Sequence, residues 1–155
     1  MLIIGIDPGK SGCAVAIDVA TRKVVDVCRF AKETPSAIDN WLDDLTAGAE
    51  AFAYLEKVGA MPNQGVSSTF AFGEAVGLVR GLLIGNGIGF AEVRPQAWQK
   101  ALGVKKQATK GELKKAMQAL AWQLHPETPV KTIDVADAVL IARYGLLHTK
   151  GGHDA

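Results

Sequence analysis

The first eighteen residues constrain the fold more strongly than any other stretch of this chain. Residues 2–6 are continuously apolar and mostly β-branched, a pattern typical of a strand that is covered on both faces. Pro8-Gly9 predicts a turn, and Gly12 opens a second strand over 13–17 after a loop that permits only an antiparallel return. Asp7 then lies at the edge of the core, where an ionised carboxylate needs a cation or hydrogen-bond donors to stabilise it.

Two other interpretations of this stretch have to be weighed. An Asp before Pro-Gly is an ordinary turn former, so Asp7 alone supports a structural role as well as a functional one. Residues 9–11 match the end of a phosphate-binding loop, but that motif needs glycine where Ile4 stands. An acid inside such a loop would also repel phosphates. The stretch therefore predicts no nucleotide cofactor.

Apolar periodicity and turn residues place the remaining elements of an α/β chain. The first three strands form an antiparallel unit, and a fourth and a fifth strand alternate with helices. A long helix is expected to be capped by Ser67 or Ser68. The expected strands are 2–6, 13–17, 23–30, 51–55 and 88–93, and the expected helices are 35–47, 67–85, 95–102, 109–124 and 134–146.

The length of 155 residues and a hydrophobic share of 48% fit one globular domain, which we place at 1–148. Residues 149–155 are expected to form a flexible tail, with His148 and His153 as tail residues rather than ligands. There is no basic leader and no apolar run judged long enough to cross a bilayer, so we expect a soluble, cytoplasmic protein. Cys13 and Cys28 fall in predicted strands and have no metal-binding spacing.

Acidic residues occur at the ends of two buried strands and at the start of the last helix. Asp7 ends the first strand, Glu56 ends the fourth, and Asp134 and Asp137 share the first turn and one face of the helix. An Asp pair at a helix start is also a common cap and dipole partner. If all four carboxylates meet, they repel one another, and divalent cations are the usual compensation. Oxygen ligands without a Cys/His cluster favour Mg²⁺ or Mn²⁺, and a pair of ions would support phosphodiester hydrolysis.

The net charge of +1 conceals an uneven distribution of charge along the chain. Residues 1–74 hold ten acids and six bases, whereas residues 75–155 hold six acids and eleven bases. A basic segment over 94–115 is the sharpest part of this asymmetry and predicts a surface that binds a polyanion. For Lys114 and Lys115 a solvated helix face is a fair alternative. The candidate DNA-binding residues are Arg94, Lys105, Lys106, Lys110 and Lys114.

Glycines recur every four residues along the long helix, at Gly73, Gly77, Gly81 and Gly85. Each costs roughly 0.5 to 1 kcal/mol relative to alanine in an exposed helix, so a compensating close approach is expected. We therefore predict that the aliphatic face of this helix lies on the sheet. The glycine face would lie on a second subunit or, with equal weight, on another helix of the same chain.

These ordered motifs resemble the RuvC-like Holliday-junction resolvases of the RNase H-like nuclease superfamily over nearly the whole chain. The motifs are GIDPG at 5–9, YLEKV at 54–58, EAVGLVRG at 74–81, RPQAWQKALGV at 94–104 with ATKGEL at 108–113, and DVADAVLIA at 134–142. The resemblance implies an RNase H-like α/β fold: a five-stranded mixed sheet, three antiparallel and then two parallel strands, flanked by helices. It implies that Asp7, Glu56, Asp134 and Asp137 are the catalytic acids and hold about two Mg²⁺ or Mn²⁺ ions per site.

The same resemblance assigns the long helix over 68–85 to a homodimer interface. It places Lys105 or Lys106, together with Lys110, near the scissile phosphate. One departure is Gly59, which stands where bacterial cellular members carry a bulky aromatic that opens the junction centre. Strand separation would then fall to other residues, such as Phe70. This departure, a short helix at 35–47 and a tight turn after Pro8-Gly9 look more like a phage or prophage relative.

The expected function is a homodimeric, metal-dependent endonuclease that makes paired symmetric cuts in a four-way DNA junction. One alternative is a nuclease of the same superfamily that acts on flaps, forks or structured RNA, like the YqgF-type members. A second is a non-catalytic junction-binding protein, against which the presence of all four acids argues. A sugar-kinase-like or actin-like ATPase would need two such domains and a second phosphate loop, which 155 residues do not supply.

Overall fold

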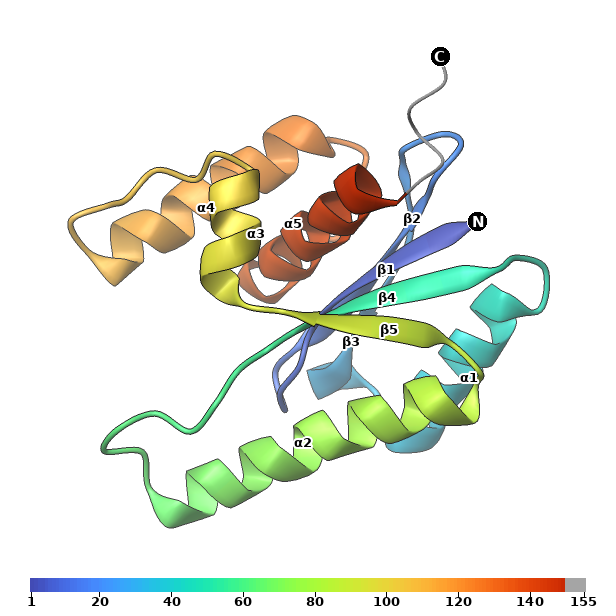
Figure 1. Cartoon of the computed structure of the whole chain (residues 1–155), viewed down its shortest axis with the longest axis horizontal. Coiled ribbons are helices and arrows are strands. Elements are labelled where there is room, and N and C mark those ends of the chain that lie inside the picture. Colours follow the sequence, from blue (N-terminus) through green and yellow to red (C-terminus); the bar gives the residue numbers. More distant parts are fainter. Residues whose placement is uncertain (150–155) are drawn as a thin grey trace.

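The computed structural model describes residues 1–149 and contains one five-stranded mixed sheet (Figure 1). The strands are β1 (Leu2–Asp7), β2 (Cys13–Asp18), β3 (Val24–Arg29), β4 (Ala51–Glu56) and β5 (Gly89–Val93). Their order across the sheet is β3-β2-β1-β4-β5. The pairs β1–β2 and β2–β3 are antiparallel, whereas β1–β4 and β4–β5 are parallel. This confirms the expected sheet of three antiparallel and then two parallel strands.

Helices cover both faces of the sheet (Figure 1). On one face lie α1 (Pro35–Thr46) and α2 (Val66–Gly85), and on the other lie α3 (Pro95–Ala101), α4 (Lys110–Leu124) and α5 (Ile133–His148). A short 3-10 helix, η1 (Phe30–Lys32), follows β3. The α1/α2 layer packs on Ile4 and Ile6 of β1, and the α5 layer packs on Val15 and Ile17 of β2. Successive residues of a strand point to opposite faces of the sheet, so they pack into two separate hydrophobic cores, one on each face.

A backbone-to-backbone contact fixes how closely α5 approaches the centre of the sheet. A Cβ atom added at Gly5 of β1 would lie 2.1 Å from the Ala142 nitrogen and 2.3 Å from the Ala138 oxygen of α5. No side chain fits in that space, so Gly5 is the residue that lets α5 lie directly on β1. Gly12 serves the turn after β1 in the same way, because a Cβ there would lie 2.1 Å from the Asp7 carbonyl oxygen.

The helix starts are well explained by local chemistry, with one correction. Thr34 caps α1 by accepting a hydrogen bond from the Ala37 N–H, and Thr109 and Glu112 form a reciprocal capping box at α4. The expected cap of the long helix at Ser67 or Ser68 is wrong. There Gly65 has the extended N-cap backbone, and its carbonyl oxygen accepts the first helical bond from the Thr69 N–H. Backbone geometry alone therefore starts α2.

The sequence expectation that no apolar run is long enough to cross a bilayer also needs correction. Within residues 1–149, α2 is long and apolar enough to do so by length and composition, with 20 residues and a mean hydropathy of 1.2. The core helix of a soluble protein passes the same test, so this property by itself carries little weight.

Two smaller expectations concern the cysteines and the chain end. Cys13 and Cys28 are buried and free, as expected. The tail expected at 149–155 falls almost wholly outside the described residues, and so does His153. Thr149, the last described residue, donates a hydrogen bond from its hydroxyl to the Gly145 carbonyl oxygen at 2.8 Å.

Candidate active site

Two strand ends bring the first pair of acids together. The parallel register of β1 and β4 pairs Ile6 with Leu55, so Asp7 and Glu56 follow at the same edge of the sheet. Antiparallel pairing also sets Asp7 opposite Cys13 and Cys13 opposite Arg29, which forms one row across three strands. Cys13 belongs to the core under α5, so this row faces the α5 layer. The last helix thus lies over the acids.

The Asp7 carboxyl is the most strongly perturbed of the four acids. Burial raises its pKa to about 8, and the negative charges of Glu56, Asp137 and Asp134 contribute to the rise, while Lys114 opposes them. A carboxyl group that stays protonated near neutral pH is unusual and marks a place where negative charge is concentrated. The structure therefore brings the acids of β1, β4 and α5 into one electrostatic cluster.

Glu56 is held in place by an aromatic side chain from α3. The Trp98 indole Nε1–H donates a hydrogen bond to Glu56 Oε1 at 3.0 Å, and Trp98 is 1% exposed. Burial raises the pKa of Glu56, the Trp98 hydrogen bond lowers it, and the net shift is upward. The sequence placed Trp98 only on a short helical turn, because nothing local shows that an indole will meet a carboxylate 42 residues away.

Asp137 faces the same cluster from α5 and has a cation beside it. Lys114 Nζ of α4 lies 3.8 Å from Asp137 Oδ2, and the carboxylate side chain is 17% exposed. Burial raises the pKa of Asp137 although Lys114 opposes the shift. The Lys114 side chain is 53% exposed, so it lies on a solvated helix face as the alternative expected, and its ammonium group also contributes to the field of the acids.

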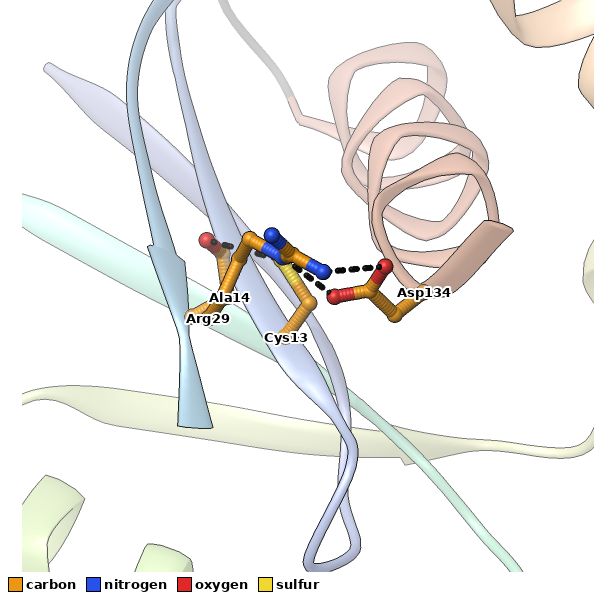
Figure 2. A network of polar contacts seen from close by, with 4 residues as sticks. All are labelled: Cys13, Ala14, Arg29 and Asp134. Carbon is orange, nitrogen blue, oxygen red and sulfur yellow. Dashed lines mark hydrogen bonds and ion pairs between the residues drawn. The ribbon is translucent and has the colours of Figure 1, made fainter. Parts of the chain in front are cut away.

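Asp134 has a different environment, which Figure 2 shows. Arg29 at the end of β3 donates from Nε to Asp134 Oδ2 at 2.6 Å and from Nη2 to Asp134 Oδ1 at 3.1 Å. Burial opposes ionisation of Asp134, but the hydrogen bonds, led by that from Arg29, outweigh it and lower its pKa. Asp134 and Asp137 share the first turn of α5, yet each is paired with a separate cation. Sequence reasoning missed Arg29 entirely.

Cys13 lies between these groups without taking part in their chemistry. Its Sγ–H donates a long hydrogen bond of 3.6 Å to the Ala14 carbonyl oxygen (Figure 2). Burial raises the pKa of the thiol well above its ordinary value, and the charges of Asp134 and Asp7 raise it further. A thiol that resists ionisation is neither a nucleophile nor a metal ligand. Cys13 is therefore a packing residue.

The donor chemistry of the cluster fits a hard divalent cation. All the candidate ligands are carboxylate oxygens, which Mg²⁺ and Mn²⁺ prefer, and their mutual repulsion is what such an ion relieves. In the side-chain positions of residues 1–149, no three His, Cys, Asp or Glu residues form a ready set that could hold an ion. The salt bridges of Asp134 and Asp137 with Arg29 and Lys114 are consistent with this, since these cations occupy carboxylate oxygens.

The candidate DNA-binding residues separate into three places. Lys105, Lys106 and Lys110 line a hollow of about 610 Å³ between α3 and the start of α4, which we call the lysine hollow. Arg94 lines a second hollow beyond the end of β4. Lys114 lies beside Asp137. The two hollows are adjacent, because Gln96 lines both of them.

The glycine face of α2 is open. Cβ atoms added at Gly73, Gly77, Gly81 or Gly85 would meet no atom within 4 Å, whereas Val76, Val79 and Leu83 on the other face are buried. Apolar residues of the same helix are exposed as well, with Phe70 at 68% and Ile84 at 69%. Within residues 1–149 no other helix covers the glycine face, so the alternative of packing inside one chain is wrong.

The mixed sheet in the order 3-2-1-4-5, with helices on both faces, defines an RNase H-like fold. Among solved structures the chain is similar to Thermus thermophilus RuvC bound to a Holliday junction substrate, with a TM-score of 0.64, 18% identity, and 98% of this chain and 97% of that chain covered. A second structure of Thermus thermophilus RuvC gives the same TM-score and identity over 96% and 95%. At this identity the likeness shows the fold. No protein-family model and no curated protein sequence matches the chain.

Proposed function

We propose that this protein is a metal-dependent endonuclease that resolves four-way DNA junctions by paired, symmetric phosphodiester hydrolysis. The observation that carries the proposal is the convergence of Asp7, Glu56 and Asp137 from β1, β4 and α5, with raised pKa values. This concentration of negative charge lies beside Lys114, whose positive charge suits a polyanion. The similar RuvC structure bound to a Holliday junction supports the choice of substrate.

The four acids would hold Mg²⁺ or Mn²⁺, with Asp7, Glu56 and Asp137 as the central ligands. The bound ions would activate a water and stabilise the attacking and leaving oxygens of an in-line displacement. Asp134 would supply a further carboxylate oxygen or help to orient the water. Trp98 orients Glu56 by its hydrogen bond at 3.0 Å. Lys114 adds positive charge beside the reacting phosphate.

The basic residues around the acids would bind the DNA backbone. Lys105, Lys106 and Lys110 in the lysine hollow would neutralise phosphates of one arm, and Arg94 would neutralise others from its separate hollow. Such contacts position a branched substrate without reading its sequence. The protein would act on DNA in the cytoplasm.

A homodimer through α2 would supply the second cut. The open glycine face permits close approach of two helices, and Val66, Phe70 and Ile84 are exposed apolar residues that the contact would bury. A twofold interface presents two equivalent acid clusters, one for each of two symmetric strands.

The test is cleavage of a mobile four-way DNA junction in Mg²⁺ or Mn²⁺, beside matched duplex, flap and stem-loop RNA. The wild-type protein should nick two symmetric strands of the junction, and Asp7→Asn should abolish the cuts. A matched control is Asp44→Asn, which removes an exposed acid of α1 and should cleave normally. Cleavage of flaps or RNA in preference would identify a different structure-selective nuclease, and tight binding without cleavage would identify a junction-binding protein.

A further inference from the structure

Two hollows in the surface share a wall beside the acid cluster. The Asp7 hollow, of about 370 Å³, is lined by Asp7 and the turn that follows it, and by Ser68 and Ala71 of α2. The Arg94 hollow, of about 650 Å³, begins at Lys57, the residue after Glu56, and extends to Arg94. Phe72 and Gln64 line both hollows. Any chain that passes from the first hollow to the second therefore meets Phe72 at their boundary.

Phe72 presents an aromatic surface at this boundary. It lies on α2 and is partly exposed, whereas Val76 one turn later is buried. A Cβ atom added at Gly9 would lie 3.5 Å from Phe72 Cε2, so the ring lies close to the turn that carries Asp7. An aromatic ring with partial exposure is the kind of surface on which an unpaired base stacks.

The chemistry of the Arg94 hollow matches the parts of one nucleotide. Val58, Met61 and Pro95 supply apolar surface for the faces of a base. Gln64 and Gln96 supply amides for its edge, and the Gln64 Oε1 already accepts from the Met61 N–H, which leaves its amide nitrogen to donate elsewhere. Lys57 and Arg94 supply positive charge for a phosphate at the rim.

We propose that the Arg94 hollow binds one unstacked nucleobase of the DNA strand being cut, next to the phosphate held at Asp7, with its face on Phe72 and its edge against Gln64 and Gln96. This inference rests on the proposed nuclease function and goes beyond it, because it assigns a subsite and a source of base preference. The base leaves the stack of its own strand, and stacking on Phe72 offsets part of that cost. Discrimination among bases then arises from the two amides.

The first experiment combines a protein variant with a change in the substrate and measures how their effects on junction affinity add. All proteins carry Asp7→Asn, so that the junction is bound and not cut. Phe72→Leu removes the aromatic face and keeps an apolar side chain. Base–aromatic stacking contributes about 1–3 kcal/mol, so the variant should bind roughly 5- to 150-fold more weakly. Junctions with an abasic nucleotide at each position around the cut are then compared. At one position, removing the base should abolish the effect of Phe72→Leu, because the two changes remove the same contact.

Phe90→Leu is the matched control, since Phe90 is another partly buried phenylalanine and lines neither hollow. Equal melting temperatures of the three proteins show that the fold is kept. If Phe72→Leu and the abasic change are additive at every position, or if Phe72→Leu binds like its parent, the base subsite is overturned. If the wild-type protein neither binds nor cleaves the junction, the proposed function itself is overturned. Failure of the base subsite and failure of the proposed function are thus distinguishable.

A second variant tests the edge contact without touching the fold. Gln96 is exposed, and Gln96→Ala should flatten the preference for one base at the position found above. The control is Gln118→Ala, a glutamine of α4 that lines neither hollow. A base preference that is identical in Gln96→Ala and wild type removes this residue from the subsite.

Discussion

Arg29 and Asp134 lie 105 residues apart in the sequence and form a two-point ion pair, with Nε to Oδ2 at 2.6 Å and Nη2 to Oδ1 at 3.1 Å. Planar pairing of this kind gives orientation as well as attraction. The pair joins the end of β3 to the first turn of α5. Its hydrogen bonds lower the pKa of Asp134, which sets Asp134 apart from the three acids whose pKa values are raised.

The first prediction concerns this ion pair. Arg29→Gln leaves Asp134 without its partner beside the other acids, so the free energy of unfolding of the metal-free protein should fall. Urea denaturation without divalent ions measures the change. Asp134→Asn should restore much of the loss when it is combined with Arg29→Gln. Additive effects of the two substitutions would mean that the side chains do not depend on each other.

A second prediction concerns Asp7 and metal binding. Since the neighbouring acids and burial disfavour its charge, Asp7→Asn should raise the free energy of unfolding of the metal-free protein at pH 8.5 by at least about 1 kcal/mol. Mg²⁺ or Mn²⁺ should raise the melting temperature of the wild type, because it binds only the folded state. The variant should show much less of that increase. An equal rise in both proteins would remove Asp7 from the ligand set.

A third prediction concerns how stability depends on pH through His125, a buried histidine outside the acid cluster. His125 is 1% exposed, and its Nδ1 lies 3.0 Å from Glu127 Oε1, which also accepts from the Val24 N–H. Burial lowers the pKa of His125, and Arg143 and Arg22 add to the shift, while Glu127 opposes it. Below about pH 6.5 the unfolded state then binds more protons than the folded state, so stability falls as pH falls.

The measurement is the urea midpoint of unfolding at pH 7 and at pH 5.5. His125→Gln should reduce the difference between the two midpoints, since this residue no longer titrates. Glu127 does not reverse the sign, because its pKa is also lowered and its contribution is lost only at more acidic pH. A wild type and variant with the same pH dependence would show that other groups dominate acid unfolding in this range.

The fourth prediction concerns whether the glycine face of α2 forms a dimer interface. A Cβ at Gly77 meets nothing within 4 Å in one chain, so Gly77→Ala should stabilise an isolated monomer by about 0.5–1 kcal/mol. Gly77→Leu should weaken a dimer that packs closely on this face. Light scattering at micromolar concentration measures the effect. If both variants and wild type have the same mass, α2 is not the interface.

The fifth prediction concerns the lysine hollow. Replacing Lys105, Lys106 and Lys110 by alanine should weaken junction binding and reduce the slope of log affinity against log salt by roughly one for each phosphate that is no longer neutralised. Lys23→Ala is the control, an exposed lysine that does not line the hollow. An unchanged slope would place the DNA elsewhere.

Local patterns were sufficient for most of the fold. The apolar run before Asp7, the Pro8-Gly9 turn and the apolar periodicity of residues 109–124 are each local patterns, and the structure has the strand, the turn and the helix there. The start of α2 could not be predicted in the same way. Gly65 caps it through backbone conformation, without the side-chain oxygen that a sequence pattern shows.

The partners of the acids are determined by tertiary contacts, which no local sequence pattern shows. In the sequence, Arg29 is one residue near the end of a predicted strand, and Trp98 is one apolar residue of a short predicted helix. Both meet their carboxylates only because the sheet register and the α5 layer bring them there. The question of what covers the glycine face also needed coordinates, since the same spacing serves a neighbouring helix and a second subunit equally well.

The contact of Gly5 with Ala138 and Ala142 has a consequence for how the acids keep their distances. Asp7 follows on the strand and Asp137 precedes on the helix, so main-chain atoms in direct contact set the spacing between these two carboxylates. Farther along α5 the helix meets the sheet through side chains instead, where Ile3 and Tyr54 lie against Gly145. A single methyl group at Gly5, by contrast, would displace the whole helix and both of its aspartates together.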